Sequence, residues 1–186
     1  MSRISILLRV SIGLGLLAGC IVARPQAPGA IPASRGTTLT GIPVVLPDAV
    51  RGKVGVLVVG FTKDSKEAMR AWGKRLAADY PTTAGVVYYE IPVLASAPSL
   101  ARVTIEEEMK VSMPAAERAH FLPLTQNEAG WLAVTHYVKG DDAYVVLIAG
   151  DGAVRWQTQG AVSDAKYAEL KGKIGEMQAA MSAAGR

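Results

Sequence analysis

The chain has 186 residues, a formal net charge of +4 at pH 7 and a single cysteine. One cysteine cannot form an internal disulfide, so packing must hold the fold, and the length suffices for one domain with one core. Arg3 and Arg9 lie in the N-terminal leader, and subtracting them from +4 leaves +2 for the remainder. No Lys/Arg cluster points to nucleic acid as a partner.

The leader combines these arginines with a short apolar segment, Val10–Leu17, followed by small residues. This layout is typical of a secretory signal, and the segment is too short for a membrane-spanning helix, which needs about 20 apolar residues. Leu17-Ala18-Gly19-Cys20 resembles the lipobox of bacterial lipoproteins, in which a signal peptidase cuts directly before a lipid-modified cysteine. An uncleaved anchor or an ordinary secretory signal is the alternative.

The lipobox resemblance implies a signal peptide over residues 1–19 and acyl chains, palmitate among them, on Cys20. Several acyl chains hold a protein at a membrane where one chain binds only reversibly. The mature protein would then be lipid-anchored in the bacterial cell envelope and face the periplasm. By resemblance to enteric lipoproteins, Ile21 after the cysteine favours sorting to the outer membrane.

Residues 20–38 are rich in proline, alanine and glycine and show no periodicity, so we expect a flexible tether there,. The folded domain is predicted over residues 39–181, and residues 182–186 form a tail.

Within the domain, apolar and alternating runs predict five strands, and apolar residues at helical spacing predict three helices. Asp64 with Glu67, and Thr104 with Glu107, have the spacing of helix N-caps,. Asp151-Gly152 is a hairpin turn signal before an edge strand,. The strands are expected over residues 39–46, 54–61, 85–94, 143–149 and 154–158, and the helices over residues 65–78, from 104 to about 113, and 163–181.

The buried strand, helix, buried strand order over residues 54–94 implies a right-handed parallel crossover. Helices are expected on both faces of a mixed central sheet, which is a three-layer α/β fold. A helical insertion over about residues 100–138 interrupts the pattern before the last hairpin.

The order of these elements resembles thioredoxin-like proteins. The stretch LTGIPVVLPDAVRGKVGVLVVGF (39–61) is similar to the entry of periplasmic thioredoxin-like and peroxiredoxin-like domains, and VVLIAGDGAVRWQTQG (145–160) to their last hairpin. The strand, glycine turn and Arg-Trp strand over Tyr144–Trp156 also resemble the ATP10 family, as does Phe61–Leu76 with Trp72. ATP10 proteins have a thioredoxin-like core without active-site cysteines and help a membrane subunit of ATP synthase to assemble.

The redox machinery of the thioredoxin family is missing from this chain. By the family's spacing, its two cysteines at the start of the first helix fall near Lys66 and Met69. Neither side chain can form the thiolate that such chemistry needs. The family's cis-proline falls near Asp141 or Asp142, and neither is proline. Thiol-disulfide exchange and cysteine-based peroxidase activity by the chain's own residues are therefore excluded.

Other chemistry is sparse. His120 and His136 are the two histidines of the chain, sixteen residues apart, and a metal site would need help from Asp141 and Asp142,. We interpret both histidines as structural, and expect neither a metal nor a cofactor. The acidic run Glu106–Glu108 is interpreted as a solvated helix start,.

Aromatic residues offer a candidate partner surface, because aromatics are enriched at protein interfaces. Trp131 and Phe121 lie in the insertion, and Trp156 lies on the expected edge strand. The alternative is that these side chains cover the sheet, which is the assignment for Trp72 on the apolar stripe of the first helix.

The sequence thus predicts a membrane-anchored, non-catalytic thioredoxin-like module that binds or assembles an envelope or membrane protein. Its partners would be membrane lipid through Cys20 and a protein. Two alternatives stay open: a thiol oxidoreductase or peroxiredoxin relative that works without its own cysteine pair, and a metal or small-molecule carrier.

Overall fold

The computed structural model describes residues 29–81 and 85–184 of the chain. The predicted signal peptide and Cys20 lie outside the described residues, as does the first part of the predicted tether. Within the described part, no helix combines the length and the apolar composition that a membrane crossing requires.

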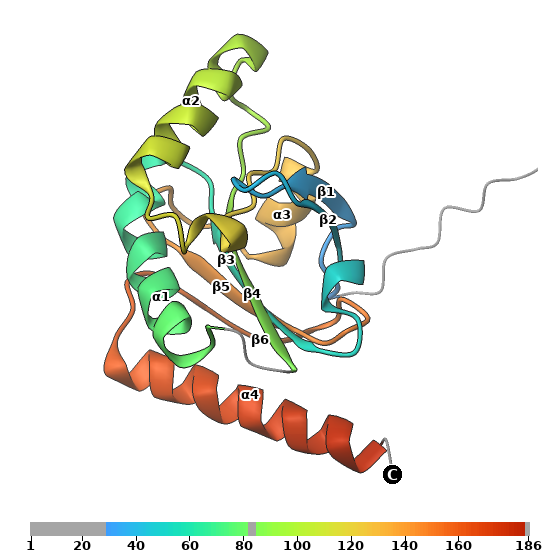
Figure 1. The fold of residues 1–186 in the computed structure, drawn as a ribbon. Helices are drawn as coiled ribbons and strands as arrows, with labels where there is room; N and C mark the ends of the chain where they lie inside the picture. Colours follow the sequence, from blue (N-terminus) through green and yellow to red (C-terminus); the bar gives the residue numbers. More distant parts are fainter. Residues whose placement is uncertain (1–28, 82–84, 185–186) are drawn as a thin grey trace, which may run out of the picture.

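A four-stranded mixed sheet forms the centre of the domain, in the order β4-β3-β5-β6 (Figure 1). The all-apolar runs predicted as buried strands are its inner strands, β3 (Val54–Gly60) and β5 (Tyr144–Ile148), in which every residue is buried. The edges are β4 (Val86–Pro92), parallel to β3, and β6 (Val154–Gln159), antiparallel to β5. This confirms the predicted parallel crossover, the hairpin and the edge position of the last strand.

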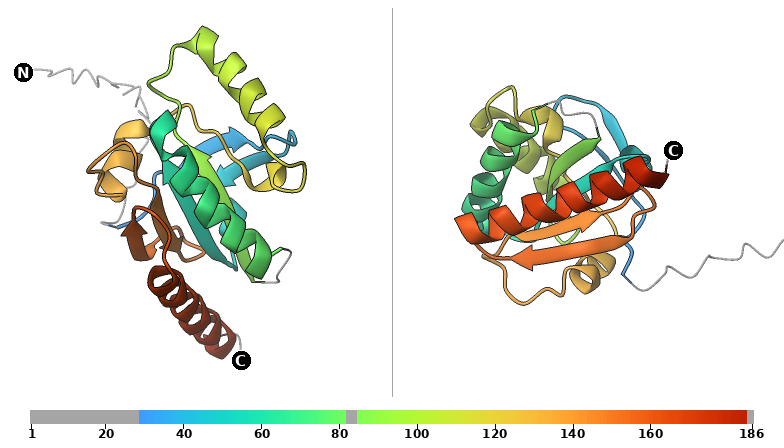
Figure 2. Two further views of the ribbon diagram at one scale, coloured as in Figure 1. Left: turned by 90° about the vertical axis from the view of Figure 1, so that its left-hand side faces the viewer. Right: turned by 90° about the horizontal axis from the view of Figure 1, so that it is seen from below.

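Helices α1 (Lys66–Asp79) and α4 (Asp164–Ala184) cover one face of the sheet (Figures 1 and 2). Trp72 and Leu76 of α1 and Leu170 and Ile174 of α4 are buried against alternate side chains of β3 and β5. The indole Nε1 of Trp72 also donates a hydrogen bond to the Gly160 carbonyl, 3.0 Å away.

The opposite face is covered by a small hairpin, β1 (Ser34–Thr37) with β2 (Pro43–Leu46), and by the short helix α3 (Glu128–Val134). Leu46, Trp131 and Leu122 share a second apolar cluster with Leu57 and Ile91 of the sheet. Two apolar layers with a sheet between them make the predicted three-layer α/β fold.

Helix α2 (Ser99–Ser112) follows β4 and projects from one end of the domain (Figure 1). The capping box predicted at Thr104 lies inside this helix, which begins five residues earlier, after Pro98. Within the described residues, three short 3-10 turns complete the elements: η1 (Asp48–Val50), η2 (Lys63–Ser65) and η3 (Arg118–His120).

The start of the first helix also differs from the prediction. The N-cap residue of α1 itself, Ser65, makes no side-chain capping hydrogen bond. Asp64 lies inside the 3-10 turn η2 that precedes α1, and Thr62 caps that turn: its Oγ1 accepts the amide hydrogen of Asp64 and donates to the Gly140 carbonyl, 2.7 Å away. A hydroxyl can do both, whereas an ionised carboxylate only accepts. Thr62 therefore ties the start of α1 to the loop before β5.

Part of the predicted tether belongs to the folded domain. Ser34–Thr37 pairs with β2, and Ile31 and Ser34 are buried. The proline-rich composition of this segment does not predict a strand. The strand forms because it pairs with β2, farther along the chain. At the other end, α4 continues to Ala184 and so includes the first residues of the predicted tail.

Candidate functional site

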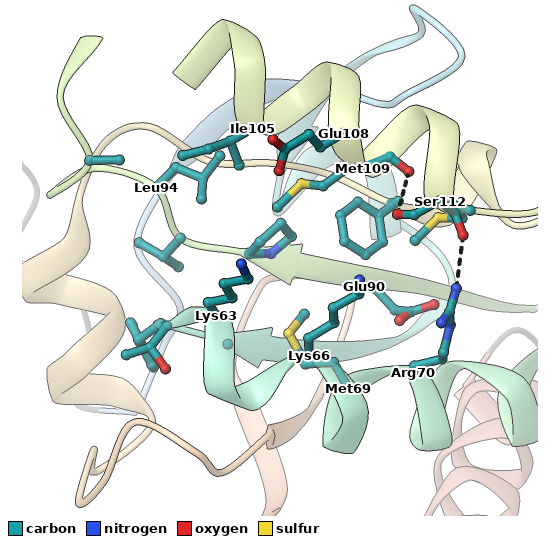
Figure 3. Close-up of a pocket in the computed structure, with 18 of the residues that line it drawn as sticks. Lys63, Lys66, Met69, Arg70, Glu90, Leu94, Ile105, Glu108, Met109 and Ser112 are labelled. Atoms are coloured by element: carbon teal, nitrogen blue, oxygen red, sulfur yellow. Dashed lines mark hydrogen bonds between the residues drawn. The ribbon is translucent and has the colours of Figure 1, made fainter. Parts of the chain in front are cut away.

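A cavity of about 560 Å³ lies between helices α1 and α2, at the carboxyl ends of the parallel strands β3 and β4 (Figure 3). In α/β sheets this edge is the usual place for a ligand. Its lining residues come from the end of β3, from η2 and α1, from β4 and the loop after it, and from α2.

The walls are mainly apolar. Phe61, Leu94, Ile105, Met109 and Phe121 line the cavity. Positive charge lies along its α1 side, where Lys63, Lys66 and Arg70 also line it. The guanidinium of Arg70 spans the cavity rim and donates to the Ser112 carbonyl of α2, 2.9 Å away.

Lys66 and Met69, the two positions predicted from the sequence to correspond to the thioredoxin family's cysteines, both line this cavity. Lys66 is the first residue of α1, and its side chain is exposed. Met69 is buried in the first turn, and its Sδ accepts a hydrogen bond of 3.6 Å from the Ser65 hydroxyl. These two positions therefore carry a cation and a thioether, and neither group can exchange disulfides,.

Glu90, on β4, is the most unusual group in the cavity lining. Its side chain is 3% exposed, and no hydrogen bond or ion pair to its carboxyl group occurs within residues 29–81 and 85–184. Burial raises the pKa of Glu90 to about 8, with a smaller rise from nearby Glu117 and an opposing effect from Arg70. This carboxyl group is therefore mostly protonated at neutral pH.

A glycine on the first helix makes room for this carboxyl group. Gly73 faces Glu90 so closely that a Cβ there would clash with both carboxyl oxygens. The interior of a helix disfavours glycine by about 1 kcal/mol relative to alanine, so close approach by Glu90 accounts for Gly73. On the same strand, Tyr88 stacks on His120 with ring centroids 4.0 Å apart.

Helix α2 borders the cavity without joining the core. None of its residues is buried. Ile105 and Met109 face the cavity, while Leu100, Val103 and Val111 are 90%, 68% and 85% exposed. Residues three and four apart share a helix face, so the second set forms an apolar stripe on the outer side.

The predicted aromatic partner surface is wrong in its main residue. Trp131 is fully buried, and its Nε1 donates to the Ser34 hydroxyl, 3.1 Å away. Phe121 is also buried and lines the cavity. Trp156 is half-buried on the edge strand, with its Nε1 bonded to a Glu169 carboxylate oxygen. The alternative, that these aromatics cover the sheet, holds for Trp131.

The candidate metal ligands are not brought together. His120 Nδ1 lies 3.1 Å from the Tyr88 carbonyl oxygen, whereas His136 Nδ1 contacts the side-chain amide of Gln157. Asp141 and Asp142 instead pair with Lys139. Within the described residues, no three His, Cys, Asp or Glu side chains gather as a metal site would require.

Sequence reasoning missed Glu90, although the signal was present. Glu90 is the one charged residue in the run GVVYYEIPVL, predicted as a buried strand. A charged residue is almost never fully buried unless it is paired, so an acid in such a run marks a special environment.

Several solved structures share this architecture. StoA from Bacillus subtilis is 12% identical, with a TM-score of 0.52 over 77% of this chain and 99% of that one. The exposed lipoprotein thioredoxin Etrx1 from Streptococcus pneumoniae is 11% identical, with a TM-score of 0.56 over 76% and 98%. BsSco, a member of the Sco family of cytochrome c oxidase assembly proteins, is 15% identical, with a TM-score of 0.54 over 78% and 94%.

The domain has the thioredoxin-like fold. At these identities the likeness establishes the fold alone. No protein-family model matches the sequence, and no curated protein matches it significantly. The resemblance to ATP10 therefore stays a prediction.

Proposed function

We propose that this protein is a lipid-anchored, envelope-facing module that binds another envelope protein through the outer face of α2, without thiol chemistry of its own. One observation carries the proposal. Helix α2 buries no residue in the core yet exposes Leu100, Val103 and Val111 along one stripe. Core packing does not explain apolar residues there, whereas exposed apolar patches mark interaction sites.

The docked partner segment would itself be apolar. The stripe is interrupted by Glu107, which pairs with Lys110 at 2.6 Å and so presents little net charge. Amphipathic segments recognise one another through anchors at helical spacing. Lys66 and Met69 at the thiol positions support a binding role over a redox role.

Crosslinking in the native envelope tests this proposal. A photo-reactive residue at position 103 of the full chain should capture one discrete protein partner. The triple variant Leu100→Ser, Val103→Ser, Val111→Ser should lose that partner in a proximity-labelling experiment. The matched control is Ile42→Ser with Val138→Ser, which removes two other exposed apolar side chains from outside α2.

Two results would overturn this function. One is an unchanged set of labelled partners in the triple variant. The other is robust insulin reduction or peroxide consumption by the purified protein, which would favour a thiol-oxidoreductase relative.

Anchoring rests on the lipobox and has its own test. The wild-type protein should partition into the detergent phase and carry the mass of acyl chains, whereas Cys20→Ala should move to the aqueous phase. A wild-type protein without acyl mass would refute the lipid anchor and leave the binding role to be judged on α2.

A further inference from the structure

The cavity beneath α2 differs in chemistry from the outer stripe of that helix. We propose that it binds a small single-chain amphiphile with an anionic head, the head at Lys63 and Lys66 and the chain against the apolar wall. This ligand site goes beyond the proposed partner docking, which uses the opposite face of α2, so either can fail alone.

The size and walls of the cavity suit such a molecule. Small-molecule sites commonly enclose about 300–1,000 Å³ and combine apolar walls with a few polar groups. The cavity encloses about 560 Å³, within that range. Pro92, Leu94, Ile105, Met109 and Phe121 supply surface for an alkyl chain. Methionine side chains adapt to flexible apolar ligands.

The charges at the rim select the sign of the head group. Lys63 and Lys66 extend toward the cavity in Figure 3, and neither forms an ion pair within the described part of the chain. The N-terminus of α1, a 14-residue helix, adds partial positive charge at the same place,. Glu108 is the acid on the α2 side. A cationic head would meet both lysines and Arg70, whereas an anionic head would be attracted.

Glu90 gives this site its second, independent indication of a ligand. It is a nearly fully buried carboxyl group in the cavity lining with no hydrogen-bond partner among the described residues. Burying a carboxyl group costs free energy unless a hydrogen bond or an opposite charge compensates it. The groups that face it are Arg70 from α1, Glu117 from the segment before η3 and Tyr88 from its own strand, with Lys66 across the cavity.

Protonation decides what Glu90 can do for a ligand. With a pKa of about 8, the carboxyl group keeps its proton at neutral pH and can donate a hydrogen bond,. An oxygen-rich anionic head accepts such a bond, whereas an alkylammonium head offers no acceptor. A ligand with an alkyl chain and an anionic head is therefore favoured by the apolar walls, by the two lysines and by protonated Glu90.

Equilibrium dialysis of the full chain with three probes of equal chain length tests the proposal. The probes are dodecanoate, dodecyl phosphate and dodecyltrimethylammonium. We expect one or both anions to bind and the cation to bind at least about tenfold more weakly. Stronger binding of dodecanoate assigns a carboxylate head, and stronger binding of dodecyl phosphate assigns a phosphate head.

Variants locate the site. Lys63→Ala with Lys66→Ala should weaken anion binding about tenfold or more, as loss of hydrogen bonds to a charged group predicts. Lys53→Ala with Lys74→Ala removes two exposed lysines outside the cavity and should change nothing. Met109→Trp should block the cavity, whereas Val103→Trp, on the outer face of the same helix, should not.

Four results would overturn the ligand site, and three of them concern probes that bind. These are equal binding of the cationic probe, unchanged anion binding in the Lys63/Lys66 double variant, and unchanged binding in Met109→Trp. Binding of no probe at all would equally refute it. Partner capture through α2 is measured separately, so none of these results bears on the proposed docking.

Discussion

Helices α1 and α2 each contain 14 residues and flank the same cavity, yet they are integrated into the molecule in opposite ways. Helix α1 buries Met69, Trp72, Gly73 and Leu76, whereas α2 buries nothing. Most helical stability in proteins comes from packing an apolar face. Helix α1 is therefore part of the core, while α2 borders the cavity on one side and exposes an apolar stripe, the proposed docking face, on the other.

The contrast separates a packed scaffold from a helix that only borders the cavity. The core around α1 and α4 needs no thiols, since Trp72 and Tyr167 pack against each other and both donate hydrogen bonds to backbone carbonyls. Lys66 is exposed and Met69 is buried in the same apolar cluster, so both residues are compatible with that packing. The segment between β4 and β5 carries α2, which buries no residue.

The largest difference between the helices should appear on truncating their apolar residues. Trp72→Ala removes a fully buried ring and its hydrogen bond to Gly160, so the free energy of unfolding should fall by about 3–5 kcal/mol,. Val111→Ala on α2 should change it by less than about 0.5 kcal/mol. Urea denaturation measures both. Similar losses from the two variants would mean that α2 belongs to the core.

The pH dependence of stability should distinguish Glu90 from ordinary carboxylates. Its pKa is raised on folding from 4.5 to about 8, so the folded state holds a proton that the unfolded state has lost. The contribution of neutral Glu90 is fully present below pH 4.5, declines as the pH rises, and is gone above about 8,. Its size is on the order of 5 kcal/mol.

Glu90→Gln isolates this effect, because the amide is similar in size and does not titrate. At pH 8.5 the variant should be more stable than the wild type, and at pH 4.5 the advantage should vanish. Denaturant titrations at the two values give the comparison. A stability difference independent of pH would mean that Glu90 is ionised at neutral pH or solvated in the folded protein.

The scaffold could largely be read from sequence, because its signals are local. Uninterrupted apolar runs gave the inner strands, and Trp72 and Leu76 at helical spacing gave the buried face of α1. Asp151-Gly152 marked the hairpin between β5 and β6. Each of these features depends on a few neighbouring residues.

The site could not be read in the same way, because it depends on contacts between distant segments. The sequence left open whether Trp131 lies on a partner surface or covers the sheet, because its burial depends on Ser34, 97 residues earlier, which accepts its hydrogen bond. The cavity itself joins α1 to α2 through Arg70 and the Ser112 carbonyl, 42 residues apart. Glu90 was visible in the sequence, but its lack of a partner was not.

Substitutions at two helical glycines test whether the Glu90 carboxyl group lies against α1. Gly73→Ala places a methyl group against the Glu90 carboxyl, so it should destabilise the protein by about 1–3 kcal/mol despite the better helix propensity of alanine,. Gly172→Ala in α4 meets nothing within 4 Å and should stabilise it by up to about 1 kcal/mol,. Thermal or urea denaturation gives both signs. If both substitutions stabilise, the carboxyl group does not occupy the space beside Gly73.

Local opening of single helices involves the smallest free energies. It is also the most direct measure of how α1 and α2 differ. Elements with few buried apolar contacts open at a lower free energy than the whole domain. Native-state hydrogen exchange should therefore release the amides of α2 well before those of α1, whose protection should approach the global stability. Added dodecanoate should slow exchange in α2 more than in α1, because a ligand between them ties the looser helix to the firmer one. Equal amide protection of both helices in the free protein would contradict this difference. It would mean that α2 is as rigid as α1 even without a ligand.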